Sequence, residues 1–226
     1  MDKSHTGLPG RVMLSSSTGE CQLYLISPPE FRLDDFRIKL SEALETGKVS
    51  CFQLRLKNVA DVDIRIASKA LLPICQDHGV PFIVNDRPDL AAEVGADGTH
   101  IGADDIGYKE ARRLVGKKGI VGISCYNSKH TALVGAEAGA DYIAFGAFFP
   151  TTTKTPRTRA ELELLTWWQQ TTTVPCVAIG GITVNNCTPI ISAGADFIAV
   201  ISGVWDHSDG PSAALVRFDK LCSPSN

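Results

Sequence analysis

The chain has 226 residues, of which 44% are hydrophobic and 21% are charged, as in a globular protein that buries a sizeable core. Its formal net charge is −3, so an overall basic field that would attract nucleic acid or an anionic membrane is excluded. No apolar run reaches the roughly 18 residues that suggest a membrane span. Any anionic ligand must therefore be held by local basic groups.

The first segment, residues 1–20, lacks the continuous apolar stretch of a secretory signal. We interpret it as a flexible extension that precedes a catalytic domain at 21–222. The seven cysteines are scattered, odd in number and never spaced as CxxC. A zinc site or a disulfide framework is therefore not favoured, and a reducing cytoplasm is the simplest location.

Short apolar runs alternate with longer segments of helical period. We predict strands at 22–26, 51–56, 81–85, 98–102, 120–124, 142–146, 176–180 and 197–202. We predict helices near 34–46, 61–78, 88–95, 107–115, 128–138, 158–169, 184–192 and 209–221. Strands that are almost wholly apolar suit a parallel sheet covered by helices. Eight strand–helix pairs therefore predict the α/β class and a single (β/α)8 TIM barrel.

The triplet Gly-Ala-Asp recurs at 95–97, 139–141 and 194–196, each time between a predicted helix and the next strand. Glycine supplies the left-handed helix cap there, so the triplet predicts tight loops at the bottom of the barrel. The rival fold is an open doubly wound sheet, which favours a dinucleotide motif after the first strand. The segment QLYLISPPEF contains no GxGxxG, so we set that fold aside.

Basic residues follow the second predicted strand, in a barrel whose strand ends would carry the chemistry. Alternation places Gln53, Arg55 and Lys57 on one face, and in a barrel that face is the interior. A buried guanidinium and ammonium are costly without an anion. Together they suit a phosphate or a diphosphate. The alternative is an edge strand with a solvated polar face.

Acidic residues follow the third and fourth strands. Asp86 lies in Asn85-Asp86-Arg87-Pro88, and Asp105 ends the segment GADD. Two carboxylates on neighbouring loops suit Mg²⁺, because that ion rarely takes an all-protein cage and accepts ligand oxygens and water. As an alternative, each aspartate simply caps the helix that follows it.

The remaining strand ends predict a second anion site. Thr151, Thr152 and Thr153 follow the sixth strand and precede Lys154. The pair Gly180-Gly181 follows the seventh strand, where backbone N–H groups could approach an oxyanion. The loops after strands 7 and 8 commonly hold a phosphate in such barrels. A plain tight turn is the alternative for the glycines. After the fifth strand, Cys125 is read as a small buried filler and not a nucleophile.

These segments together resemble the thiamine-phosphate synthase family. The matching stretches are QLRLK, VNDRPDLAAEVGADGTHIGADD, GISCYNS, AGADYIAFGAFFPTTTKT and VAIGGITVNN…AGADFIAVISGVW. They occur in family order and run from about Gln22 to Trp205. The resemblance implies a transferase that condenses 4-amino-2-methyl-5-(diphosphooxymethyl)pyrimidine with a thiazole phosphate. The products would be thiamine phosphate and diphosphate, by a dissociative, Mg²⁺-dependent path.

The resemblance also implies residue roles by position. The pyrimidine diphosphate would be held by Gln53, Arg55, Lys57, Asn85, Ser124 and Lys154. The thiazole phosphate would be held by Thr151, Thr152, Thr153, Gly181, Ile201 and Ser202. Asp86 and Asp105 would bind Mg²⁺, while Arg55, Lys57 and Lys154 would be catalytic through the leaving group. The family often has Gln at Ala103 and Pro at Ala147, and these two departures bear on affinity more than on the reaction.

Three other kinds of protein are alternatives to this transferase. A thiazole tautomerase-like relative is expected to lack the diphosphate set and to use a histidine in the loop that here holds Tyr126. An aldolase or epimerase would need a lysine or acid pair placed for that chemistry. A catalytically silent phosphate-ligand-binding barrel is a third alternative. The expected partners are small phosphorylated molecules, with no nucleic acid and no membrane, and the chain would act alone or as a homo-oligomer.

Overall fold

The computed structural model describes residues 20–102, 105–151 and 158–223. Its strands are β1 (Gln22–Ile26), β2 (Val49–Leu54), β3 (Phe82–Asn85), β4 (Gly98–Ile101), β5 (Ile120–Tyr126), β6 (Tyr142–Gly146), β7 (Cys176–Ile179) and β8 (Phe197–Val200). Its helices are α1 (Leu33–Glu45), α2 (Asp61–Asp77), α3 (Pro88–Val94), α4 (Tyr108–Val115), α5 (Lys129–Ala138), α6 (Leu162–Thr171), α7 (Thr188–Ser192), α8 (Ser202–Trp205) and α9 (Pro211–Cys222).

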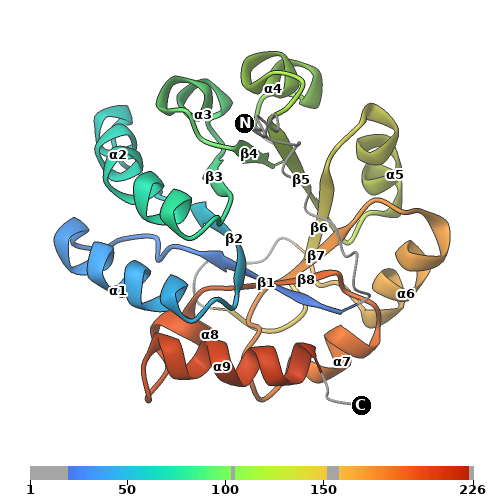
Figure 1. The fold of residues 1–226 in the computed structure, drawn as a ribbon. Coiled ribbons are helices and arrows are strands. Elements are labelled where there is room, and N and C mark those ends of the chain that lie inside the picture. Colours follow the sequence, from blue (N-terminus) through green and yellow to red (C-terminus); the bar gives the residue numbers. More distant parts are fainter. Residues whose placement is uncertain (1–19, 103–104, 152–157, 224–226) are drawn as a thin grey trace, which may run out of the picture.

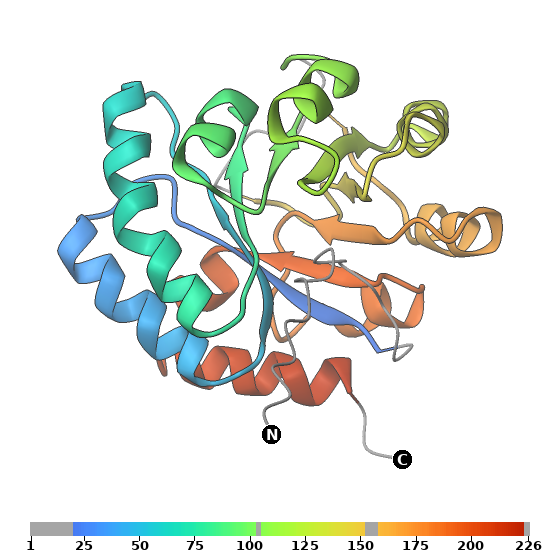
Figure 2. The ribbon, with the colours of Figure 1, turned by 45° about the horizontal axis from the view of Figure 1, so that its top comes forward.

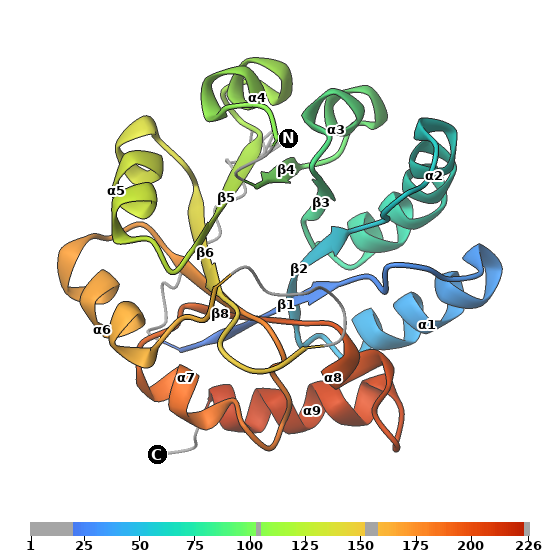
Figure 3. The same cartoon turned by 180° about the vertical axis from the view of Figure 1, so that it is seen from behind.

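The strands form a closed parallel barrel in chain order, and β8 returns to pair with β1. The helices surround the strands on the outside (Figures 1 and 2). The last helix, α9, lies beside α1 and completes the ring, as the view from behind also shows (Figure 3). The predicted (β/α)8 TIM barrel is therefore confirmed, and the open sheet is excluded.

Each strand is apolar because both of its faces are buried. In β1, Leu23 and Leu25 face the helices, whereas Tyr24 and Ile26 belong to the cluster that fills the barrel. All four side chains are almost fully buried. Burying such a side chain contributes about 1.5–3 kcal/mol to folding. The inner face differs from the outer one because it carries polar atoms, such as the Tyr24 hydroxyl, within the apolar filling.

The three Gly-Ala-Asp loops behave as predicted. Gly95 and Gly139 cap α3 and α5 in the left-handed conformation. The aspartates, which we call the base aspartates, each accept the backbone N–H of an earlier strand: Asp97 from Phe82 at 2.7 Å, Asp141 from Val121 at 2.8 Å and Asp196 from Cys176 at 2.8 Å. The loops thus fasten neighbouring strands at the end of the barrel opposite the predicted site.

Some boundaries differ from the sequence predictions. β2 lies two residues earlier than predicted, and β5 continues past Ser124 to Tyr126 through an irregular register. The short helix α8 was not predicted. The predicted extension at 1–20 lies outside the described residues except for Glu20. Over the residues with assigned positions, no helix is long and apolar enough to cross a membrane.

Candidate active site

A cavity of about 330 Å³ lies at the carboxyl ends of the barrel strands. All of the predicted site residues that the structure describes line it: Gln53, Arg55, Lys57, Asn85, Asp86, Asp105, Ser124, Thr151, Gly181, Ile201 and Ser202. Thr152, Thr153 and Lys154, as well as Ala103, lie outside the described residues. The residues that the sequence analysis assigned to separate loops therefore lie around one cavity.

Arg55 extends into this cavity from the segment that follows β2. Its backbone N–H donates to the Ser27 hydroxyl at 2.9 Å, which fixes where the side chain leaves the barrel. Its Nη1 atom is buried and has no hydrogen-bond partner among the described residues. Burial lowers the pKa of the guanidinium, and the charge of Asp86 opposes that shift. An unpartnered buried cation donor is costly, so the cavity favours an anion beside Arg55. The solvated edge-strand alternative is excluded because β2 pairs with both β1 and β3 in the closed barrel.

Lys57 and Asp86 form an ion pair between the ends of β2 and β3. Asp86 holds a left-handed backbone with φ of 63°, which is uncommon for a residue other than glycine. Its N–H donates to the His100 carbonyl at 2.8 Å. This conformation turns the Asp86 carboxylate toward the cavity, which Asp86 lines beside Lys57.

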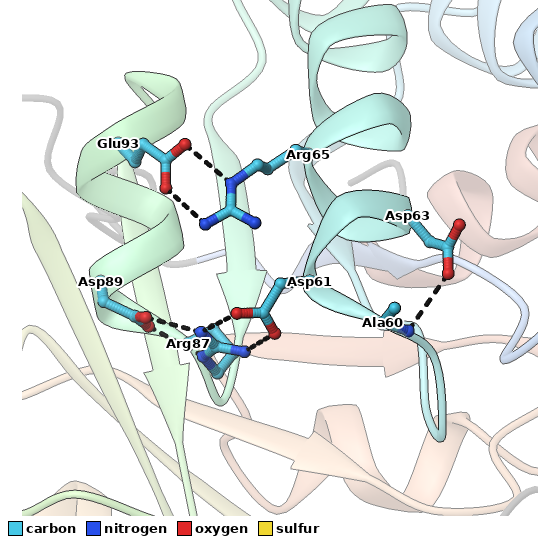
Figure 4. Close-up of polar contacts among 7 residues, drawn as sticks. All are labelled: Ala60, Asp61, Asp63, Arg65, Arg87, Asp89 and Glu93. Atoms are coloured by element: carbon cyan, nitrogen blue, oxygen red, sulfur yellow. Dashed lines mark hydrogen bonds and ion pairs between the residues drawn. The ribbon is translucent and has the colours of Figure 1, made fainter.

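The next residue, Arg87, is clamped between two helices (Figure 4). Its guanidinium donates to both oxygens of Asp61 on α2 and both oxygens of Asp89 on α3, including Nη2 to Asp61 Oδ2 at 2.8 Å. A second pair, Arg65 to Glu93 at 2.7 Å, joins the same helices. Bidentate contacts of this kind fix orientation as well as position. They anchor the β3–α3 loop immediately after Asp86.

Asp86 and Asp105 lie close enough for each carboxyl group to shift the pKa of the other. Burial and the neighbouring Asp86 raise the pKa of Asp105. For Asp86, burial acts against ionisation, but contacts with Lys57 and Asp105 outweigh it and lower the pKa. Asp105 also accepts the Gly102 N–H at 2.6 Å. The adjacent carboxylates are therefore arranged as one acidic pair.

Helix capping does not explain this acidic pair. The N-cap residues of α3 and α4 are Arg87 and Gly107, and neither helix has a side-chain cap. Within the described ranges, no three or more His, Cys, Asp or Glu side chains come together as metal ligands. A hard cation bound by Asp86 and Asp105 would take its other oxygens from ligand and water, as Mg²⁺ does. The donor set therefore fits the predicted metal.

A chain of buried polar groups crosses the floor of the cavity. Gln53 Nε2 donates to the Tyr24 hydroxyl at 3.0 Å, which lies 2.8 Å from the Tyr142 hydroxyl. The Tyr142 hydroxyl is 2.9 Å from His100 Nδ1, and His100 Nε2 is 2.8 Å from the Ser124 hydroxyl. Sequence reasoning missed both tyrosines and His100. Alternation along β1, β4 and β6 places Tyr24, His100 and Tyr142 on the inward-facing side of the barrel, and this alternation was the available signal.

The opposite side of the cavity is built from backbone. Gly180 and Gly181 have φ of 107° and 64°. A Cβ on Gly181 would lie 2.2 Å from the Pro150 carbonyl oxygen, so only glycine fits. Asn186 Nδ2 holds the Gly181 carbonyl at 2.9 Å. Ser202 begins α8, whose first N–H groups have no partner within the helix. Thr158, which sequence reasoning also missed, lines the same cavity.

The two residues that follow Ser124 are a buried cysteine, Cys125, and a tyrosine that lines the cavity, Tyr126. Cys125 is fully buried, and burial raises the pKa of its thiol to about 12. The thiol therefore stays protonated and suits a filler and not a nucleophile. Tyr126 has φ of 55° and lines the cavity beside Gly102. All seven cysteines are buried.

Comparison with known proteins gives one consistent result. Residues 23–204 match the sequence model of the family described as thiamine monophosphate synthase. The thiamine-phosphate synthase of Rhodospirillum centenum is 54% identical over 202 residues, which cover 89% of this chain and 98% of that protein. The protein of the same name from Hyphomonas neptunium is 48% identical over 205 residues, with 88% and 93% covered.

Solved structures agree with these sequences. Thiamine phosphate pyrophosphorylase from Pyrococcus furiosus superposes with a TM-score of 0.78 and 33% identity, covering 89% of this chain and 95% of that one. Orotidine 5'-phosphate decarboxylase from Pyrococcus horikoshii superposes with a TM-score of 0.66 at 13% identity, which shows a shared fold alone.

Proposed function

Because this chain belongs to the thiamine monophosphate synthase family, we propose that the cavity at its barrel mouth is the active site of that synthesis. The enzyme is a transferase that condenses 4-amino-2-methyl-5-(diphosphooxymethyl)pyrimidine with a thiazole phosphate and releases diphosphate. The observation that carries the site assignment is the buried Arg55 donor beside the acidic pair Asp86 and Asp105.

Arg55, Lys57 and Asn85, which line the cavity, bind the diphosphate of the pyrimidine substrate, and Lys154 is assigned to the same group. The orphaned Nη1 of Arg55 gains an acceptor, and the burial cost of its charge is offset. Lys57 contributes a second positive charge, although in the structure without ligand this ammonium group is paired with Asp86. Lys154 is assigned from the family motif PTTTK alone, since it lies outside the described residues.

Asp86 and Asp105 are the residues that would hold Mg²⁺. A bound ion would supply positive charge to offset the negative charge of a leaving diphosphate. Asp86 and Asp105 give the site its acidic pair, and the clamp on Arg87 keeps the Asp86 loop in place. Family membership supports a Mg²⁺ requirement in general terms, and the adjacent carboxylates support these two ligands.

The thiazole phosphate binds on the far side of the cavity. Gly181, Ile201, Ser202 and Thr151 all line the cavity, and Gly181 has no side chain to keep a ligand from its backbone. Thr152 and Thr153 are assigned to the same phosphate from the motif. Two anchored phosphates act as handles that hold the thiazole nitrogen against the pyrimidine CH₂ carbon, and such positioning supplies much of the rate.

The difficult step is breakage of the CH₂–O bond. Arg55, Lys57 and Lys154 stabilise the charge on the departing diphosphate. The thiazole nitrogen carries no proton, so its attack needs no general base. The protein therefore acts mainly through electrostatics and orientation. The partners are small phosphorylated molecules, and the chain works alone or as a homo-oligomer. Its seven buried thiols fit a reducing compartment such as the cytoplasm.

A diphosphate-release assay with both substrates tests this function. Purified protein with Mg²⁺ should release one diphosphate per thiamine phosphate, and a chelator should stop the reaction. Release of diphosphate without the thiazole phosphate, or no release at all, would contradict the proposal. A thiazole tautomerase-like activity would instead act without the pyrimidine. Tyr126, where that relative is expected to use a histidine, argues against it.

A further inference from the structure

The loop that leaves β7 is held from three sides. β7 lies between β6 and β8 in the barrel, and the first residues of its loop line the cavity (Figure 1). On the β6 side, the Phe149 N–H donates to the Gly180 carbonyl at 3.0 Å. On the β8 side, a Cβ on Gly203 would lie 2.5 Å from the Ile182 carbonyl oxygen, so α8 packs directly on the loop. The third contact comes from Asn186.

Asn186 binds the loop through both ends of its side-chain amide. Its Oδ1 atom accepts the Thr183 N–H at 2.7 Å, and its Nδ2 atom donates to the Gly181 carbonyl at 2.9 Å. A backbone N–H can only donate and a carbonyl can only accept, so these two partners allow the amide a single orientation. The Asn186 backbone N–H also donates to the Thr183 carbonyl at 3.1 Å. The side chain is therefore fixed relative to the loop.

The contact with the Gly181 carbonyl also sets the direction of the next N–H group. The carbonyl of Gly181 and the N–H of Ile182 belong to one planar trans peptide, so they point to opposite sides of it. Gly181 and Ile182 both line the cavity, whereas Asn186 is not one of the described residues that do. The Gly181 carbonyl therefore points away from the cavity, and the Ile182 N–H points toward it.

The Ile182 N–H is a donor that lacks a backbone acceptor. Within the part of the chain that the structure describes, neither Gly181 nor Ile182 donates its N–H to a backbone carbonyl. The Thr183 N–H, in contrast, is accepted by Asn186. Ile182 is almost fully buried, and a buried N–H without an acceptor is costly. An oxyanion in the cavity would supply that acceptor.

We propose that Asn186 is a positioning residue for the thiazole phosphate, because it turns the Gly181–Ile182 peptide so that the Ile182 N–H donates to that phosphate. This inference rests on the proposed function. Asn186 does not touch the ligand and acts through the peptide that it holds. Its other hydrogen bond keeps the Thr183 N–H away from the phosphate. One side chain thus determines which N–H group of the loop faces the ligand.

Two substitutions separate the contacts of Asn186. Asn186→Ala removes both contacts, whereas Asn186→Asp keeps one oxygen for the Thr183 N–H and places the other against the Gly181 carbonyl. Two oxygen atoms with no hydrogen between them repel each other, so the peptide should turn in both variants. The affinity for the thiazole phosphate, measured by calorimetry, should fall about tenfold or more in each, as expected when a hydrogen bond to a charged group is lost.

Two further ligands distinguish positioning of the phosphate from general damage to the protein. Pyrophosphate with Mg²⁺ should bind both variants as it binds the wild type, because Arg55 and its neighbours follow β2 on another part of the cavity wall. The unphosphorylated thiazole alcohol lacks the group that the Ile182 N–H should hold. Its kcat/KM should therefore be the same in the wild type and in both variants, whereas a disordered loop would lower activity with either thiazole.

Asn185→Ala is the matched control. Asn185 is the exposed neighbour of Asn186, so its loss should leave the affinity for the thiazole phosphate within about twofold of the wild-type value. The new charge in Asn186→Asp is controlled by repeating the titrations of this variant and the wild type at about 0.5 M salt, which screens charges but does not restore a turned peptide. If Asn186→Ala does not fold, Asn186→Asp keeps the acceptor for Thr183 and carries the test alone.

Wild-type affinity for the thiazole phosphate in Asn186→Asp would overturn the inference, since Asn186 would then serve only to hold Thr183. A loss that disappears at high salt, or that is equally large for pyrophosphate, would overturn it as well. Each of these results, with a wild-type enzyme that binds the thiazole phosphate, leaves the proposed function intact. A wild-type enzyme that binds no thiazole phosphate would refute the proposed function itself.

Discussion

Lys57 Nζ is paired with Asp86 Oδ2, so a cation assigned to the diphosphate and a carboxylate assigned to the metal neutralise each other within the protein. Both side chains are partly exposed, at 39% and 24%. Under the proposed assignment, diphosphate would compete with Asp86 for Lys57, and Mg²⁺ would compete with Lys57 for Asp86, when either binds alone. When both bind, Lys57 would pair with a phosphate oxygen and Asp86 with the metal ion.

Asp86→Asn should separate these two effects. Without the carboxylate, Lys57 is released, and pyrophosphate should bind about threefold more tightly in the absence of Mg²⁺, as expected for a partly exposed ion pair. The variant should also need a higher Mg²⁺ concentration for half-maximal activity. Calorimetric titration of pyrophosphate with and without Mg²⁺ measures both. Unchanged metal dependence would remove Asp86 from the metal site.

Arg55→Met should change affinity and stability in opposite directions. The substitution removes a buried donor that has no partner among the described residues, so the free energy of unfolding should rise by about 1 kcal/mol. Pyrophosphate affinity should fall about a hundredfold, since a charge-assisted contact is lost. Denaturant unfolding and pyrophosphate titration give the two values.

The control for Arg55 is Arg113→Met. Arg113 is exposed on α4 and paired with Glu110. Its loss should change stability by less than about 0.5 kcal/mol and pyrophosphate affinity not at all. If Arg55→Met destabilises the fold, the guanidinium is structural and the anion assignment loses its main support.

Gly181→Ala should impair the thiazole phosphate side alone. The new Cβ would meet the Pro150 carbonyl at 2.2 Å, so the loop must shift. We expect the KM for the thiazole phosphate to rise about tenfold or more, because a small misplacement of a binding group is costly. Gly47→Ala is the control, because Gly47 has the same φ of 64° with no atom within 4 Å. It should lose about 1 kcal/mol of stability and no activity.

The clamp on Arg87 predicts a pH dependence of stability. Arg87 lowers the pKa of Asp61 and of Asp89 through direct hydrogen bonds. A carboxyl whose pKa is depressed on folding stabilises the protein above its unfolded pKa of about 3.9, and that stability is lost as pH falls through the folded value. Asp61→Asn should therefore lower Tm at pH 7, and the difference from wild type should vanish once the pH falls below the folded pKa of Asp61. A Tm difference that is constant with pH would contradict this reading.

Asp97→Ala tests the role of the base aspartates. It removes the acceptor for the Phe82 N–H, so the free energy of unfolding should fall by about 1–3 kcal/mol. Activity at 25 °C should stay within about twofold, since the site lies at the other end of the strands. Asp77→Ala, at an exposed position on α2, should change neither. Loss of activity without loss of stability in Asp97→Ala would reverse the assignment.

Sequence reasoning recovered the barrel because its signals are local. Apolar strands, helical periods and Gly-Ala-Asp loops are each visible within a dozen residues. Arg55 and Asp86 were also accessible, since strand alternation and strand ends locate them in a barrel. The tyrosine chain was not found, because it joins β1, β4 and β6 and depends on which strands face each other across the interior. The α2–α3 clamp on Arg87 depends in the same way on helix neighbours.

The base aspartates have a further consequence. Asp97 binds β3 with its side chain and accepts the Ile120 N–H of β5 with its backbone carbonyl at 2.8 Å. Asp196 likewise joins β7 to β1, by accepting the Gln22 N–H at 2.8 Å. Single residues thus link three consecutive strands around the circumference, far from any substrate. Because these contacts close the barrel at one end, loops at the opposite end can change in sequence or length without separating the strands. The same scaffold can therefore support different active sites.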